Sequence, residues 1–154
     1  MAVYSMANAK IYIGTTAAAA DLAAYKLDTY TQIGEVATIS ALNDVQNFAE
    51  FTALADGRAR QVKTTRSGEN ITLTCGFDPD DAGQNAVRAA AAVTSQEAYN
   101  FKVVYNDNGE TNPTTVFWKG KAGNESFPGG STGDIETVEY MVTNDTGFTA
   151  ELRA

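Results

Sequence analysis

The sequence contains few groups of residues that could carry out chemistry. The stretch Gly129-Gly130-Ser131-Thr132-Gly133 matches the G-x-S-x-G pattern that surrounds some nucleophilic serines. That mechanism needs a histidine base and a turn from strand to helix, whereas this chain has no histidine and the stretch precedes a predicted strand. We therefore interpret it as a surface turn.

Carboxylates offer a second possible chemistry, because they bind metals and transfer protons. Asp78 and Asp80 could open a calcium loop, but Ala89 stands where an EF-hand needs a bidentate glutamate, so a helix cap is the better interpretation. Glu136 and Glu139 are three residues apart on a predicted strand and therefore lie on opposite faces. We predict no catalytic residue, no metal site, no cofactor and no enzymatic activity.

Length and charge narrow the function further. The 154 residues suit one domain, 1–154, and carry 11 cationic and 19 anionic side chains for a net charge of −8. Such a surface is unsuited to gripping nucleic acid phosphates. The single cysteine, Cys75, rules out an intrachain disulfide, and no stretch approaches the length of apolar sequence that a membrane span needs.

The charges are unevenly divided along the chain. Residues 1–77 hold six cations and seven anions, while residues 78–154 hold five cations and twelve anions. Within the first half, a local basic cluster comprises Arg58, Arg60, Lys63 and Arg66. Such a cluster is either a solvated loop or one side of a contact with an acidic surface, and copies of this chain supply both signs.

Alternating apolar and polar residues predict that strands dominate. Residues 71–77 alternate strictly, with Ile71, Leu73 and Cys75 on one face. Further strands are predicted at 11–13, 30–36, 99–105, 114–121, 135–142 and 147–152. We expect a mainly β fold, a sandwich or barrel of six to eight strands with one flanking α-helix, and an α+β fold as the alternative.

Helix signals concentrate at residues 79–93. The preceding Asp78 and Asp81 are capping residues, Pro79 is tolerated in a first turn, and alanines then recur at helical spacing. We expect this helix to pack a face of small residues, including Ala82 and Ala89, closely against a sheet. A weaker alanine-rich stretch at 17–24 is a candidate for a second short helix.

Residues 40–68 predict a long extended arm. Phe48 and Phe51 have a spacing compatible with a helical face, but Asp56-Gly57 and Ser67-Gly68 bracket a polar, basic segment that favours a hairpin. A segment of this length with few core candidates is typically functional or bound to a partner. We interpret it as an interaction element.

Four segments, taken in order, resemble the tail tube proteins (major tail proteins) of long-tailed bacteriophages and related gene transfer agents. They are KIYIGTTA (10–17), YTQIGEV (30–36), FTALADGRARQVKTTR (51–66) and DPDDAGQ (78–84). None is a chemical motif, so their joint order carries the resemblance.

That resemblance implies a β-sandwich with a flanking helix, six copies to a ring, and rings stacked into a hollow tube. Strands from all six subunits would join into one barrel around the lumen, and the arm would reach the adjoining ring. The implied partners are further copies of the chain, the tape-measure protein, double-stranded DNA passing without sequence-specific binding, and tail terminator and distal tail proteins at the ends, with no membrane. The implied location is the virion tail, assembled in the host bacterial cytoplasm.

The resemblance also assigns expected roles to residues. Contacts between rings are expected from the arm residues Phe48, Phe51, Arg58, Arg60, Lys63 and Arg66. Candidates for the lumen lining are Thr72, Thr74, Glu136 and Glu139, and like charge would keep DNA mobile there.

Two other functions remain open. The inner-tube protein of a contractile injection or secretion machine shares the implied fold. A monomeric β-sandwich binding module is the second, although such a module would be expected to show a surface aromatic platform and no long arm.

Overall fold

Short strands make up most of the computed structural model, which describes residues 3–92, 94, 96–107 and 112–153. The strands in those residues are β1 (Lys10–Ile13), β2 (Thr31–Ile33), β3 (Val36–Ile39), β4 (Asp44–Thr52), β5 (Ala59–Gly68), β6 (Ile71–Gly76), β7 (Tyr99–Val104), β8 (Thr115–Gly120), β9 (Ala122–Ser126), β10 (Thr137–Val142) and β11 (Thr149–Glu151). The helices are α1 (Leu22–Leu27) and α2 (Ala82–Ala92). Within the described chain, neither helix has the length and apolar character that crossing a bilayer requires.

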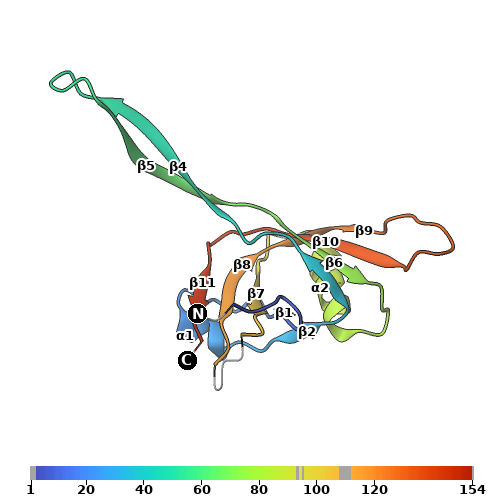
Figure 1. Cartoon of the computed structure of the whole chain (residues 1–154). Helices are drawn as coiled ribbons and strands as arrows, with labels where there is room; N and C mark the ends of the chain where they lie inside the picture. Colours follow the sequence, from blue (N-terminus) through green and yellow to red (C-terminus); the bar gives the residue numbers. More distant parts are fainter. Residues whose placement is uncertain (1–2, 93, 95, 108–111, 154) are drawn as a thin grey trace.

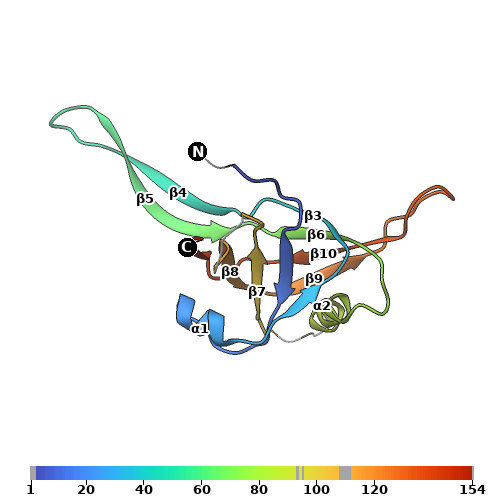
Figure 2. The ribbon, with the colours of Figure 1, turned by 60° about the horizontal axis from the view of Figure 1, so that its bottom comes forward.

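The strands form two larger sheets and one separate hairpin (Figure 1). One sheet has the order β11-β8-β7-β1-β2, the other β3-β6-β10-β9, and every pairing is antiparallel. The strands β4 and β5 of the hairpin pair with each other and with no other strand of the described residues, and the hairpin projects far from the body (Figures 1 and 2). The prediction of a mainly β fold with a flanking helix and a long arm is confirmed.

One hydrophobic core lies between the two larger sheets. It combines inward-facing residues of the five-stranded sheet, such as Phe101 and Trp118, with Leu73 and Tyr140 of the four-stranded sheet and Val87 of α2. The rings of Phe101 and Trp118 stack with their centroids 5.5 Å apart. Because these aromatic side chains are fully buried, they pack the core and offer no platform to nucleic acid bases.

The structure has more strands than the six to eight predicted. Beyond the seven predicted ranges, two further strands are β4 and β5 of the arm, and a third is β9. The fourth arises at Glu35, whose backbone φ of 57° breaks the predicted strand 30–36 into two. The first piece, β2, joins the five-stranded sheet and the second, β3, joins the four-stranded sheet. Asn108-Gly109, a residue pair typical of the hairpin turn expected between the predicted strands 99–105 and 114–121, lies outside the described residues.

The flanking helix α2 begins three residues later than predicted, because Asp81 serves as its cap. The Asp81 carboxylate accepts a hydrogen bond from the Gln84 amide at 2.8 Å and another from the Gly34 amide at 3.0 Å. The predicted end, Val93, lies outside the described residues. The second short helix, predicted at 17–24, is present as α1. It begins after its cap, Asp21, and covers residues 22–27, so the alanine run before Asp21 is not helical.

The buried face of α2 differs from the predicted one. Ala82 and Ala89 are exposed, whereas Gly83, Gln84 and Val87 are buried. Gly83 sets this rotation, because its missing side chain lets the helix touch the β2 backbone: a Cβ there would overlap the Gln32 carbonyl oxygen. The predicted approach through small residues is therefore right in part: Gly83 makes the closest contact, and of the predicted alanines Ala90 is buried and Ala86 packs against the core.

Gln84 joins the helix to both sheets. Its side-chain amide donates to the carbonyl oxygens of Gly34 at 3.0 Å and Gly76 at 2.8 Å, and its oxygen accepts from the Asp78 amide at 3.1 Å. These bonds satisfy a fully buried polar side chain and fix the ends of β2 and β6 relative to α2.

The close approach at Gly83 gives the first prediction. Gly83→Ala should gain about 1 kcal/mol in helix propensity but lose more by overlap with the β2 backbone, for a net destabilisation of about 1–3 kcal/mol. Urea unfolding followed by the fluorescence of Trp118, the single and fully buried tryptophan, measures this. Gly133→Ala is the control, because a Cβ there meets nothing within 4 Å, and it should change stability by less than about 0.5 kcal/mol.

Asp28 is the hub of a second polar network, at the start of β2. Its carboxylate accepts hydrogen bonds from the Thr15 amide at 2.9 Å and hydroxyl at 2.6 Å, from the Thr29 amide at 2.8 Å and from the Asn100 side chain at 2.8 Å. Burial alone would raise the pKa of Asp28, but these hydrogen bonds outweigh it and lower the pKa below its usual value of 3.8.

The lowered pKa of Asp28 makes stability depend on acid. The ionised Asp28 carboxylate stabilises the folded state. This stabilisation is fully present above the ordinary carboxyl pKa and is lost as the pH falls through the lowered pKa of Asp28. We expect Asp28→Asn to lose about 1–3 kcal/mol at pH 7 and to converge with the wild type as the pH falls through the lowered pKa of Asp28. Unfolding curves from pH 7 to pH 2.5 measure this; Glu50→Gln, on the exposed arm, should track the wild type throughout. Parallel curves for Asp28→Asn and the wild type would contradict the assignment.

Candidate functional site: the arm and the outer sheet face

The arm, residues 44–68, is a twisted two-stranded ribbon. The pairing runs from Asp44 opposite Gly68 at the base to Thr52 opposite Ala59 near the tip, with a register shift between Gln46 and Phe48. Every residue of β5 before Gly68 is exposed. An isolated two-stranded hairpin is at best marginally stable in water, so this ribbon lacks the covering layer that normally stabilises one.

Large apolar side chains are exposed along the arm. Phe51 is 59% exposed and Leu54, at the tip, is fully exposed; Phe48 and Val62 are more than half exposed. Residues paired across the ribbon share a face, so Phe51 lies with Arg60 on one face and Phe48 with Lys63 on the other. The helical spacing of the two phenylalanines is therefore not used, and each face of the ribbon carries one aromatic and one cationic side chain.

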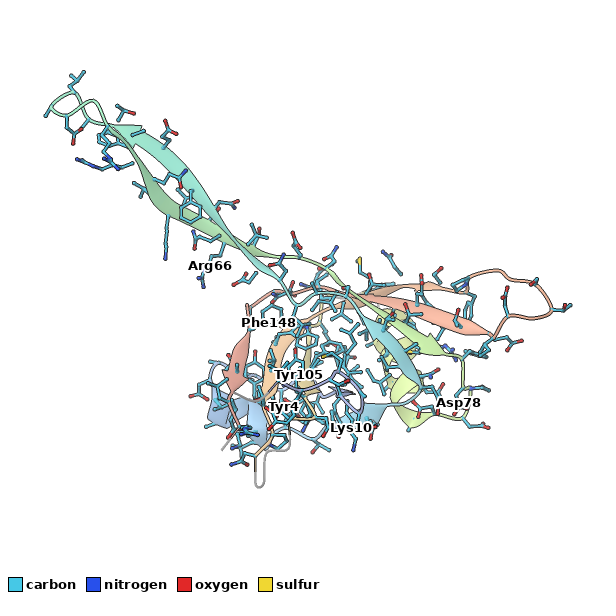
Figure 3. All side chains as sticks on the ribbon, in the orientation of Figure 1. Tyr4, Lys10, Arg66, Asp78, Tyr105 and Phe148 are labelled. Carbon is cyan, nitrogen blue, oxygen red and sulfur yellow. The ribbon has the colours of Figure 1, made fainter. Side chains whose placement is uncertain are left out.

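Contacts at the base hold the arm to the body. The Arg66 guanidinium donates to the Gln46 side-chain oxygen at 2.9 Å and lies 3.9 Å from the Asp44 carboxylate (Figure 3). Gly68 lies against Asn144 so closely that a Cβ would overlap the Asn144 carbonyl. The arm therefore leaves the body in a direction set by packing at its base.

The four predicted basic residues divide into two pairs. Arg60 forms an ion pair with Asp56 at the tip, and Arg66 is used at the base. Arg58 and Lys63 form no ion pair with any residue that the structure describes, so they are the cations of the cluster without an internal counterion.

The second candidate surface is the outer face of the four-stranded sheet. In the strand register, Thr38 of β3, Thr74 of β6, Glu139 of β10 and Ser126 of β9 pair in one row across all four strands. Thr72 lies two residues from Thr74 and shares its face. The structure thus brings three of the four predicted lumen candidates together on one polar face.

Glu136 is the exception among these candidates. It is exposed but lies one residue before β10, and its backbone carbonyl oxygen accepts a hydrogen bond from the Phe77 amide at 3.0 Å. Glu136 therefore belongs to the end of the sheet and not to its outer face. The predicted strand 135–142 began too early, which made Glu136 appear to be a strand residue.

The β9–β10 loop, residues 127–136, contains the stretch 129–133 for which the sequence predicts a surface turn. It extends on the side of the body opposite to the arm (Figures 1 and 2). Phe127 is 57% and Ile135 is 83% exposed, and the loop borders a hollow of about 810 Å³. One residue in the sequence could have indicated this exposed apolar surface: Ile135, which lies between Asp134 and Glu136 directly after a glycine-rich stretch.

A cage around Lys102 is the other polar feature that the sequence did not indicate. The Lys102 ammonium lies 4.6 Å from the ring centroids of both Tyr12 and Tyr30, and burial lowers its pKa. The rings hold the cation on the five-stranded sheet. In the described residues, no group of three histidine, cysteine, aspartate or glutamate side chains is placed to hold a metal ion.

The exposure of the arm gives a prediction about stability. Replacing Phe51 and Val62 together by serine should change the free energy of unfolding by less than about 0.5 kcal/mol, because neither side chain packs on the body. Val138→Ser, in the core, should cost more than about 2 kcal/mol. Thermal unfolding of the monomer measures both, and a large loss in the arm variant would show that the arm packs on its own body.

Comparisons with known proteins agree with these features. The family described as phage tail tube protein matches residues 14–150. No curated protein matches the sequence. Among solved structures, the chain resembles one from the sheath/tube terminator of a PVC extracellular contractile injection system (15% identity, 98% of each chain covered, TM-score 0.72). It also resembles one from the tail of an empty gene transfer agent particle (13% identity, 97% of this chain and 99% of that chain, TM-score 0.65) and the SPP1 tail tube protein (15%, 93% and 78%, TM-score 0.58).

The structural likenesses show a shared fold at low sequence identity, and the family match covers most of the chain. The exposed apolar side chains of the arm agree with a protein that works through contacts with other subunits. The chain belongs to the phage tail tube protein family, whose members are structural components of tails and not enzymes.

Proposed function

We propose that this chain forms hexameric rings that stack into the tail tube of a phage, a conduit through which double-stranded DNA is ejected into the host. The observation that carries the proposal is the arm: a long apolar and basic ribbon that pairs with nothing in its own body. Its exposed apolar area would be a liability in a monomer and is explained if another subunit covers it.

The likeness to the gene transfer agent tail, whose structure was computed with C6 symmetry, supports the proposal of six subunits per ring. Four strands from each of six subunits would then close one barrel, in which the edge strands β3 and β9 find partners on neighbouring copies. Closure of this kind removes sheet edges, which are otherwise sites of aggregation.

The polar outer face of the four-stranded sheet is the proposed lumen lining. Thr72, Thr74 and Glu139 present hydroxyls and a carboxylate there, without a cation among them. Together with the net charge of −8, this surface would repel DNA phosphates and let the polymer slide. Glu136 would lie at the rim of the lumen.

The other proposed partners follow from the place of a tube in a tail. The lumen would hold the tape-measure protein before DNA, a tail terminator and distal tail proteins would bind the two ends, and assembly would take place in the host bacterial cytoplasm. The inter-ring contacts would come from Phe48, Phe51, Arg58, Arg60, Lys63 and Arg66.

An inner-tube role in a contractile injection machine is the alternative. It is favoured by the TM-score of 0.72 to the PVC terminator structure, higher than the 0.58 to the SPP1 tail tube. A sheath gene beside the gene for this chain would support the injection machine, and a tape-measure gene downstream without a sheath gene would support the flexible phage tail.

Electron microscopy of the purified full-length protein tests the proposal. We expect rings or tubes with sixfold symmetry, and a cryo-EM map in which Thr72, Thr74 and Glu139 face the lumen. A monomer at all concentrations and salt conditions would contradict tube formation. Tubes whose lumen is lined by the five-stranded sheet would contradict the lumen assignment alone.

A further inference from the structure

The arm and the β9–β10 loop leave the four-stranded sheet at opposite ends. β6 begins at Ile71, directly after the arm, and Ile71 pairs with Val142, the last residue of β10. At the other end of the same strand pair, Gly76 pairs with Thr137, which directly follows the β9–β10 loop. The two strands therefore act as a spacer with one extension at each end, as Figures 1 and 2 show.

The two extensions are complementary in charge. The arm carries Arg58 and Lys63 without internal counterions. The β9–β10 loop carries Asp134 and Glu136 and no cation, and neither carboxylate forms an ion pair with a residue that the structure describes. Three other carboxylates of the C-terminal half have cation partners: Glu125 with Arg88, Asp145 with Lys121, and Glu151 with Lys26. Of the remaining described ones, Asp78, Asp80, Asp81, Glu97 and Glu139 lie outside the loop and form no ion pair with a described residue.

The two extensions also match in apolar surface. Leu54 at the arm tip and Phe51 behind it are exposed on one side of the molecule, and Phe127 and Ile135 of the β9–β10 loop are exposed on the other. The loop borders the hollow of about 810 Å³, which is lined by residues 128–137. An apolar centre with a charged rim on each side is the usual composition of a specific protein interface.

The β9–β10 loop is held in shape by its own contacts. The Asp134 carboxylate accepts from the Ser131 amide at 2.8 Å, and the Asp134 amide donates to the Ser131 carbonyl at 3.0 Å. Phe127 packs edge to face on Phe77, with ring centroids 5.5 Å apart. A loop ordered before binding loses less conformational entropy on docking than a floppy one.

We propose that the tip of the arm of one copy docks on the β9–β10 loop of the next copy, with Leu54 entering the hollow and Arg58 and Lys63 facing Asp134 and Glu136. This inference rests on the proposed tube, for which it names the receptor of the arm. Because the two surfaces differ and lie at opposite ends of the molecule, the contact is head to tail and repeats from copy to copy. Each nine- or ten-residue strand of the arm spans roughly 30 Å, which carries the tip well away from the body of its own subunit (Figures 1 and 2).

A cysteine cross-linking experiment tests the contact directly. Two full-length variants, Leu54→Cys and Ile135→Cys, carry tags of different size and are mixed under mild oxidation. We expect a disulfide-linked heterodimer at least tenfold more abundant than either homodimer. Cys75 does not interfere, because burial and, secondarily, Asp81 raise the pKa of its thiol to about 11.

Leu27→Cys is the matched control for cross-linking, since Leu27 is as exposed as Ile135 but lies on α1. Its heterodimer with Leu54→Cys should stay at background. Equal cross-linking of Leu54→Cys to positions 27 and 135, or a predominance of homodimers, would overturn the proposal. Microscopy of the same wild-type protein separates the two ideas: tubes without the 54–135 cross-link refute the receptor, and the cross-link without rings or tubes refutes the tube.

Charge exchange provides an independent measurement. Arg58→Glu with Lys63→Glu should raise the protein concentration needed for assembly about tenfold at moderate salt, and so should Asp134→Lys with Glu136→Lys. Combining all four substitutions should restore assembly to within about threefold of wild type. Additive loss in the combined variant would show that the two surfaces do not meet. The tryptophan fluorescence of each variant checks that the monomer is folded.

Discussion

The pairing of β6 with β10 is the interaction on which the rest of the structure depends. Six residues of each strand pair in register, and the inward-facing members, among them Leu73, Cys75 and Tyr140, are fully buried. Strand side chains alternate with a period of two. A slip of the register by one residue would therefore turn Leu73 and Tyr140 out of the core and turn Thr74 and Glu139 into it. The same register therefore fixes the core, the polar outer face and the distance between the two extensions.

The body and the arm contribute very differently to the hydrophobic core. The body buries an aromatic and aliphatic core between two sheets, while the 25 residues from Asp44 to Gly68 add almost no buried surface to it. A two-stranded ribbon of this kind lacks the covering layer that normally stabilises one, which is consistent with the proposed contact between the arm and another subunit.

Local patterns predicted much of the fold. The strict alternation at 71–77 and 99–105 gave the buried faces of β6 and β7, and Asp81 with the alanines after it gave α2. What failed depends on contacts between distant residues. The positive φ at Glu35 is not visible in the sequence, because the residues on both sides of it follow a strand pattern. The buried face of α2 is set at Gly83 by contact with Gln32, which is fifty-one residues earlier in the chain. For the candidate site, the local composition predicted the arm and its cations. Glu136 was wrongly assigned to a strand, because β10 begins only at Thr137. The position of the β9–β10 loop opposite the arm depends on the whole fold, and no local sequence pattern indicates it.

The continuity between the arm and β6 determines how the molecule carries mechanical load. Only Glu69 and Asn70 separate Gly68 from Ile71, so a pull on the arm along its length is transmitted straight into β6. That strand is flanked by β3 and β10, and a force parallel to it stretches both ladders in shear, with many hydrogen bonds sharing the load at once instead of opening one after another. A subunit held through its arm would thus resist extension at the place where its core is most tightly packed.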